Sequence, residues 1–195
     1  MASSSLLVSE HETVLAVQDE PLYEIVNGQR VELPPMSAYT TWIASRLHGR
    51  LWPYVEDKGL GTSVAEMLFV LDAEHNLRRR PDVAFVSTVR WPLDRALPET
   101  GDCEVVPDLA VEVISPNDIF KDVLAKVREY FHYGVQVVRV VAPEEQQVYV
   151  YDSPAHVRIL TGQDELTGGE VVPGFRLPLV HLFQHTTAPT VAPAS

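Results

Sequence analysis

Residues 107–116 read Pro-Asp-Leu-Ala-Val-Glu-Val-Ile-Ser-Pro, and this stretch decides the fold. Its apolar run is typical of a buried strand. Alternation along a strand places Leu109, Val111 and Val113 on one face and Glu112 on the other. We expect the Leu/Val face to pack in the core and Glu112 to point to the opposite side, where the next helix covers it. A carboxylate in such a place is rarely buried unless it is paired or binds a metal, and a half-exposed strand with one solvated acid is the alternative.

A helix and a second buried strand follow directly. Residues 115–118 form a helix-start cluster, residues 119–133 have helical periodicity, and Gly134 ends the helix at its C′ position. Residues 135–141 are another β-branched run. Strand–helix–strand implies a right-handed crossover between two parallel strands.

Upstream, the pattern predicts a hairpin and one long helix. Asn27-Gly28 between two short apolar-polar runs indicates a type I′ turn, because both residues tolerate positive φ. Four apolar residues at four-residue spacing then predict a helix that Ser37 caps and that ends near Glu56. These residues are Ile43, Leu47, Leu51 and Val55.

The whole pattern predicts an α/β protein, in which one domain has a mixed β-sheet and flanking helices. Further short strands are expected within residues 60–71 and 83–86 and between residues 146 and 160, antiparallel to their neighbours. The domain is expected to span residues 21–185. Residues 1–20 form an N-terminal extension, and the Thr/Pro/Ala-rich residues 186–195 are expected to be a disordered tail.

Composition excludes several protein classes. The 195 residues include 15 Lys and Arg against 27 Asp and Glu, a net charge of −12, which argues against a protein that coats DNA without sequence preference. An enzyme whose acids bind cations is not excluded. Cys103 is the single cysteine, so a disulfide scaffold is excluded. The sequence has no signal peptide and no apolar run of a membrane span's length, so a cytoplasmic protein without a membrane partner is expected.

Two acids and a lysine are the main candidates for chemistry. Asp82 opens a strand, where carboxylates of neighbouring strands can converge, and together with Glu112 it forms a hard oxygen site that suits magnesium or manganese. Lys126 lies at the margin of the apolar arc of the following helix, whereas Lys121 faces solvent. The alternatives are a turn acid at position 82, and a lysine that merely snorkels or pairs with Asp122.

Glu24 and a run of three arginines are weaker candidates. Glu24 alternates with apolar neighbours in the hairpin, and it is either a third acid for the cation or an exposed strand acid. Arg78, Arg79 and Arg80 come directly before Asp82. They form the best local basic patch for backbone phosphates, and a solvated turn is an equally good alternative.

These segments together resemble the Uma-type putative restriction endonuclease family of the PD-(D/E)XK nuclease superfamily. The resemblance extends from Leu22 to Phe183. It rests on the segments 23–28, 80–86, 107–116 and 172–175, and on Asp122, Lys126, Tyr130 and Gly134-Val135. It implies a restriction-endonuclease-like core and a metal-dependent endonuclease that hydrolyses DNA phosphodiester bonds.

By this resemblance Asp82 and Glu112 are the motif acids and hold Mg²⁺, for which Mn²⁺ can substitute. The family's lysine is expected two residues after the second acid, where this chain has Ile114, so the resemblance assigns its role to Lys126 on the helix. Glu24 matches an acid common near the start of the family. The resemblance implies DNA as the partner. It also implies a homodimer, because nucleases of this superfamily often act as dimers.

The chain also departs from the family's pattern. Arg139 and Ala142 stand in a strand where the family has a tryptophan and an acid, and Thr40 stands near the place of a histidine. Two other functions therefore stay open. One is a binding or structural protein with lapsed catalysis on the same fold, and the other is a metal-dependent hydrolase of small nucleotide substrates, which the acidic balance suits.

Overall fold

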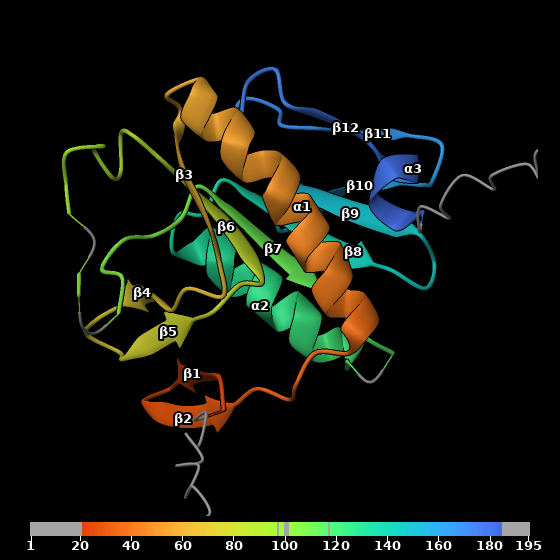
Figure 1. Cartoon of the computed structure of the whole chain (residues 1–195). Coiled ribbons are helices and arrows are strands. Elements are labelled where there is room, and N and C mark those ends of the chain that lie inside the picture. The colour runs from red at the N-terminus through yellow and green to blue at the C-terminus, as the bar shows by residue number, and fades with distance from the viewer. Residues whose placement is uncertain (1–20, 97, 100–101, 117, 185–195) are drawn as a thin grey trace, which may run out of the picture.

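The computed structural model describes residues 21–96, 98–99, 102–116 and 118–184 (Figure 1). The extension and the tail expected from the sequence lie outside these residues. In chain order the elements are β1 (Tyr23–Val26), β2 (Gln29–Glu32), α1 (Ala38–Asp57), β3 (Gly61–Ala65), β4 (Phe69–Asp72), β5 (Leu77–Arg79), β6 (Val83–Ser87), β7 (Leu109–Val113), α2 (Phe120–His132), β8 (Val137–Ala142), β9 (Gln147–Ser153), β10 (His156–Leu160), β11 (Glu165–Thr167), β12 (Arg176–Pro178) and α3 (Leu179–Phe183).

The centre of the described structure is a mixed sheet in the order β10-β9-β8-β7-β6-β3. Strands β7 and β8 are parallel, with Leu109 opposite Val137, and α2 makes the crossover between them. The other neighbouring pairs of this sheet are antiparallel. The predicted mixed α/β fold is confirmed, and with it the parallel pair around α2.

Helices cover both faces of the central sheet (Figure 1). On one face Val111 packs in a core with Ile43 and Leu47 of α1. On the other face Ala110 packs in a second core with Val127 of α2. Because β7 is buried on both faces, its Glu112 is covered by α2 as expected.

A second sheet, in the order β2-β1-β5-β4, lies beside the central one (Figure 1). The sequence predicted a single sheet, because it contains no signal for β5, an inner strand of this second sheet. Two of the three residues of β5 are arginines, so the segment has no apolar alternation by which a strand is recognised. The predicted hairpin is confirmed: Asn27 has φ 52° and Gly28 has φ 74°, as a type I′ turn needs.

The helix boundaries agree with the predicted signals. The Ser37 hydroxyl accepts a hydrogen bond from the Thr40 N–H (3.1 Å) and caps α1. Gly134 follows α2 with φ 93°. No helix in the described part of the chain combines the length and apolar character that a membrane crossing needs.

Candidate active site

Glu112 is the centre of a buried polar cluster between β7 and α2. Its side chain is almost fully enclosed, and both of its oxygens are engaged. The Tyr130 hydroxyl donates to Oε1 (2.6 Å), and the Lys126 ammonium donates to Oε2 (3.0 Å). Lys126 and Tyr130 are one helical turn apart on α2, so a single face of the helix supplies both donors. The contact between Lys126 and Glu112 is the one that the helical pattern predicted.

Asp82 reaches the same place from the neighbouring strand. In the antiparallel pair of β6 and β7, Val83 lies opposite Val111, so the register continued by one residue brings Asp82 opposite Glu112. The Val113 N–H donates to Asp82 Oδ2 (2.5 Å). Asp82, Glu112 and Lys126 line one cavity of about 830 Å³. The cavity thus contains the two carboxylates and the ammonium that the sequence singled out.

Glu24 belongs to the cluster but not to the cavity lining. Its Oε1 forms an ion pair with the Lys126 ammonium (3.1 Å) and accepts a hydrogen bond from the Arg80 N–H (3.0 Å), and its Oε2 accepts from Arg79 Nη1 (2.7 Å). The carboxylate is 2 % exposed. These contacts make Glu24 a counter-ion that positions Lys126, in place of the third metal ligand that the sequence suggested.

The three arginines do not form the phosphate-binding patch that the sequence suggested. Arg79 is buried, and its Nε and Nη2 donate to Glu129 Oε2 (2.7 and 2.5 Å). Arg78 pairs with Asp102 on the opposite side of β5. Alternation along the strand separates the two side chains. The expectation of one exposed patch is therefore wrong, and only Arg80 lines the cavity.

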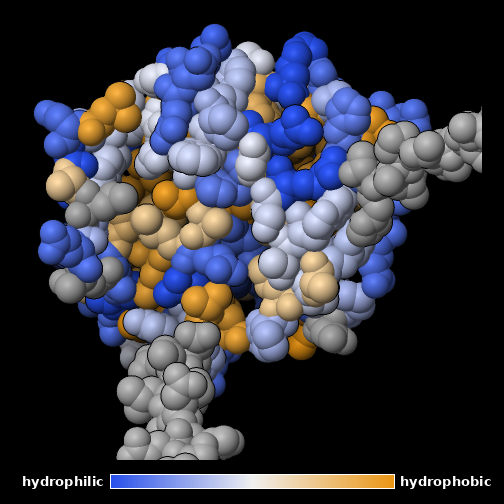
Figure 2. All heavy atoms as spheres, in the orientation of Figure 1, coloured by the Kyte–Doolittle hydropathy of each residue, from blue (hydrophilic) through white to orange (hydrophobic). Residues whose placement is uncertain are grey.

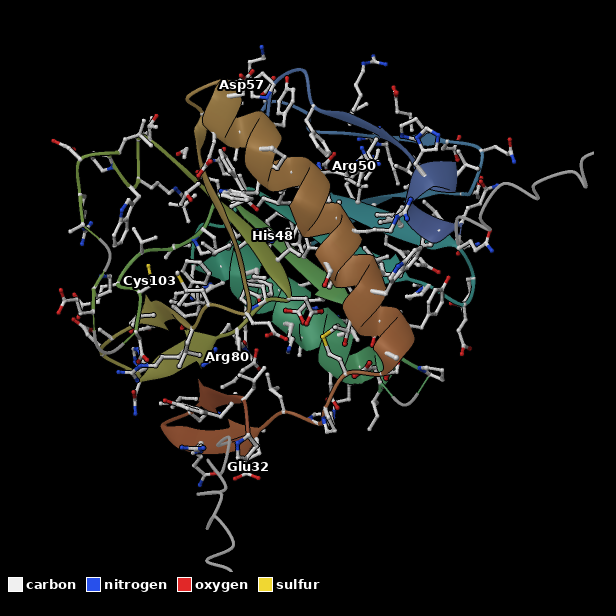
Figure 3. All side chains as sticks on the ribbon, in the orientation of Figure 1. Glu32, His48, Arg50, Asp57, Arg80 and Cys103 are labelled. Carbon is white, nitrogen blue, oxygen red and sulfur yellow. The ribbon has the colours of Figure 1, made fainter. Side chains whose placement is uncertain are left out.

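Arg80 lies between β5 and the β1–β2 hairpin (Figure 3). Its guanidinium donates to the carbonyl oxygens of Tyr23 (Nε to O, 3.1 Å) and Glu66. These two hydrogen bonds leave the cation beside the cavity with no carboxylate contact on its side chain among the described residues. Arg80 is therefore the arginine that could still meet a substrate phosphate.

Burial and neighbouring charges shift the pKa values of these groups. Burial, reinforced by the charge of Glu112, raises the pKa of Asp82 to about 7. Burial also raises the pKa of Glu112, although Lys126 opposes it. Burial alone would lower the pKa of Lys126, but Glu112 and Glu24 outweigh it and hold that pKa above its usual value. Lys126 is thus a permanent ammonium, and Asp82 is the group that titrates near neutrality.

Carboxylates outnumber cations in the cluster. Among the described residues the groups that interact by charge include five carboxylates, Glu24, Glu66, Asp82, Glu112 and Glu129, and two cations, Arg79 and Lys126. Because the pKa of Asp82 is about 7, this carboxyl group is part-protonated near neutral pH. No group of three or more His, Cys, Asp or Glu suited to a metal occurs in the described part of the chain. Asp82 and Glu112 stay the predicted pair, and carboxylate oxygens are a donor set that suits Mg²⁺ or Mn²⁺.

Some members of the cluster were not assigned their roles from the sequence. Tyr130 was named as a residue of the family resemblance without a role of its own, and Glu129 was not considered. The signal available was the spacing on α2: Lys126, Glu129 and Tyr130 stand at i, i+3 and i+4, so they share one side of the helix. Their partners Glu24 and Arg79 come from distant strands, and no local pattern links them.

Two comparisons with known proteins found a match, one to a family and one to a fold. A model of the family described as "Uma2: Putative restriction endonuclease" matches residues 9–180. The fold is similar to the crystal structure of a putative nuclease belonging to DUF820 from Anabaena variabilis ATCC 29413, with a TM-score of 0.70 and 19% sequence identity over 84% of this chain and 90% of that chain. At this identity the likeness shows the fold alone. No curated protein sequence matches the chain.

Proposed function

The chain belongs to the Uma2 family of putative restriction endonucleases, and on this basis we propose that it is a Mg²⁺-dependent endonuclease that hydrolyses DNA phosphodiester bonds. One observation carries the proposal. The Lys126 ammonium lies 3.0 Å from Glu112 and 3.1 Å from Glu24, in a cavity whose lining also includes Asp82. Two carboxylates and one fixed ammonium are sufficient parts for phosphodiester hydrolysis.

Asp82 and Glu112 would hold the cation. The Val113 N–H occupies Asp82 Oδ2, and among the described residues nothing donates to Oδ1. Each carboxylate oxygen of Glu112 has a second lone pair besides the one that Tyr130 or Lys126 uses. When bound, Mg²⁺ supplies a positive charge for a phosphoryl oxygen and lowers the pKa of water.

Lys126 would act by charge and position. Since its pKa lies above the usual value, it remains protonated and cannot take a proton from water at neutral pH. Its ammonium can instead stabilise the negative charge that grows on the phosphoryl oxygens. Hydrolysis forms one P–O bond from a water oxygen and breaks the P–O bond to the leaving sugar oxygen, which takes a proton. The products are a phosphate monoester and an alcohol.

The convergence of Asp82, Glu112 and Lys126 favours an active enzyme over a binding protein with lapsed catalysis. A protein without catalysis gains nothing from holding two mutually repelling carboxylates and an ammonium together, because burial of each charged group costs free energy. We also propose, on the sequence and the family resemblance, a cytoplasmic location and a homodimer. Light scattering after size-exclusion chromatography tests the dimer.

Cleavage of supercoiled plasmid tests the proposal. Wild-type protein should nick the plasmid with Mg²⁺ or Mn²⁺ and leave it intact in EDTA. Asp82→Asn should abolish nicking. Lys126→Met should lower the rate strongly, whereas Lys121→Met, a matched change at an exposed lysine of the same helix, should leave it unchanged. Equal rates for wild type and Asp82→Asn would overturn the proposal.

A separate measurement distinguishes loss of chemistry from loss of metal. Mg²⁺ should raise the melting temperature of wild type and of Lys126→Met, because the lysine is proposed to act on the phosphoryl group. It should not raise the melting temperature of Asp82→Asn. A Lys126→Met variant that loses both nicking and the response to Mg²⁺ would contradict the role proposed for the lysine.

A further inference from the structure

The cavity beside the carboxylates has apolar walls. One wall is the segment that joins β2 to α1, and the other is the start of α2. The apolar lining residues include Leu33, Pro35, Met36, Ile114, Ile119 and Val123. On the face drawn in Figure 2, apolar residues (orange) reach the surface near the β1–β2 hairpin and the start of α1. A volume of about 830 Å³ lies in the range of sites that enclose a small organic ligand.

Two exposed apolar residues stand where α2 begins. Ile119, which lines the cavity, is 64 % exposed, and its chain neighbour Phe120, outside the lining, is 71 % exposed. Ile119 is the N-cap of α2 and Phe120 its first residue, six and seven residues after β7 ends at Val113. An exposed aromatic side chain beside an apolar pocket can stack on the face of a nucleobase, and such contacts bind single strands with little sequence preference.

Cations, by contrast, are scarce in the cavity. Of its lining residues only Arg80 and Lys126 are cationic, and Lys126 is already paired with Glu112 and Glu24. Asp118 and Asp122 add acids to the rim, and the chain has a net charge of −12. Proteins that bind duplex DNA obtain much of their affinity from many phosphate contacts. This cavity offers few such contacts and a large apolar surface.

We propose that the cavity binds an unpaired nucleobase next to the scissile phosphodiester, so that the substrate is a single strand in place of an intact duplex. The proposal rests on the proposed function, since it names the substrate class of the same site. Bases of a duplex are stacked and paired, so a base face reaches the apolar walls only after the base is flipped out of the duplex, which costs free energy that an unpaired strand does not spend. In an unpaired strand one base enters the cavity, Phe120 stacks on it or its neighbour, and Arg80 meets a phosphate.

Fluorescence anisotropy with the Asp82→Asn variant measures this binding without cleavage. The probes are a short labelled single strand, its blunt duplex and an abasic strand of equal length. We expect the single strand to bind at least about tenfold more tightly than the duplex or the abasic strand, since base stacking is worth several-fold to a hundredfold per base. Its Kd should change less than about sevenfold between about 50 and 200 mM salt, the change that two phosphate contacts on a single strand would give.

A matched pair of variants tests the rim. Phe120→Ala should weaken binding of the single strand at least about fivefold, the lower end of one stacking contact. Leu93→Ala changes a leucine that is 70 % exposed outside the cavity lining, and it should leave the Kd unchanged. Both side chains are on the surface, so neither change should affect folding.

The outcomes separate this inference from the proposed function. Duplex or abasic strand bound as tightly as the single strand, or no binding of any probe, would overturn the inference. A free dinucleotide that displaces the labelled strand as well as an unlabelled strand does would overturn the inference and indicate a small nucleotide as the ligand. Wild type that cuts duplex faster than single strand would also overturn it and leave the proposed nuclease intact. Tight, Phe120-dependent binding of the single strand without any cleavage in Mg²⁺ would sink the proposed hydrolysis and support the binding site.

Discussion

Replacing Asp82 with asparagine should stabilise the metal-free protein. Asp82 is mostly buried and faces the negative charge of Glu112, and together these raise its pKa from 3.8 to about 7. Asparagine has the same shape, and its Oδ1 can still accept the hydrogen bond from the Val113 N–H. The substitution therefore removes an unfavourable charge and keeps the contact that places the side chain.

The size of the effect follows from the pKa. A folded-state pKa raised from 3.8 to about 7 corresponds to at most about 4 kcal/mol, and partial solvent exposure reduces this to about 2 kcal/mol. In the unfolded chain Asp82 loses its proton near pH 4, whereas in the folded chain it keeps the proton up to about pH 7. Wild type therefore loses stability as the pH rises from about 4 through 7. Asp82→Asn does not titrate and escapes this loss.

Urea unfolding in EDTA at about pH 5 and pH 8 measures the difference. The advantage of Asp82→Asn over wild type should grow by about 1 kcal/mol between the two pH values, since part of the total effect has already developed at pH 5. Asp94→Asn, a matched change at an exposed loop acid, should follow wild type at both. Mg²⁺ at about ten times its Kd should add about 1.4 kcal/mol to wild type at pH 8 and nothing to Asp82→Asn. A variant no more stable than wild type at pH 8 in EDTA would refute the argument for a strained carboxylate pair.

Three further substitutions test buried polar groups, two in the Glu112 cluster and one, Arg139, outside it. Arg79→Met should lower the free energy of unfolding by about 3–5 kcal/mol, because it leaves Glu24 buried with one counter-ion fewer, and urea unfolding showing a loss below 1 kcal/mol would contradict this role. Tyr130→Phe should lower the free energy of unfolding by about 1.5–3 kcal/mol, because it removes the donor to Glu112 Oε1. The variant should keep the Mg²⁺-induced rise in melting temperature. Loss of this rise would count against metal binding by the Glu112 carboxylate. Arg139→Met should raise the free energy of unfolding at pH 7 by about 1–3 kcal/mol. The guanidinium is fully buried, its pKa is lowered to about 10, and its Nε and Nη1 lack partners among the described residues. A clear destabilisation of the variant in urea unfolding would contradict this.

Local patterns in the sequence were sufficient for several elements. Asn27-Gly28 predicted the hairpin, because positive φ at two successive residues is needed there and few residues tolerate it. The four-residue apolar spacing predicted α1 together with its Ser37 cap. The apolar runs on both sides of α2 predicted the parallel strands β7 and β8. In each case the deciding interactions join residues close in the chain.

The arginine run shows where local patterns end. Arg79 and Arg80 are adjacent, and the sequence offers no sign that one is buried in ion pairs and the other lines a cavity. Arg79 is buried because Glu24, 55 residues earlier, and Glu129, 50 residues later, converge on it. The same convergence made Glu24 a counter-ion where the sequence suggested a metal ligand.

The sequence by itself determined the mixed α/β fold, the face of β7 from which Glu112 points, and the side of α2 that carries Lys126, since each follows from a repeat of two or 3.6 residues. Only the folded structure shows which arginine lines the cavity and that Glu24 meets Arg79 and Lys126 in one buried cluster. The physical reason is that the charge state and role of a buried ionisable group depend on the partners that meet it in space. Those partners come from strands and helices that the chain brings together only on folding.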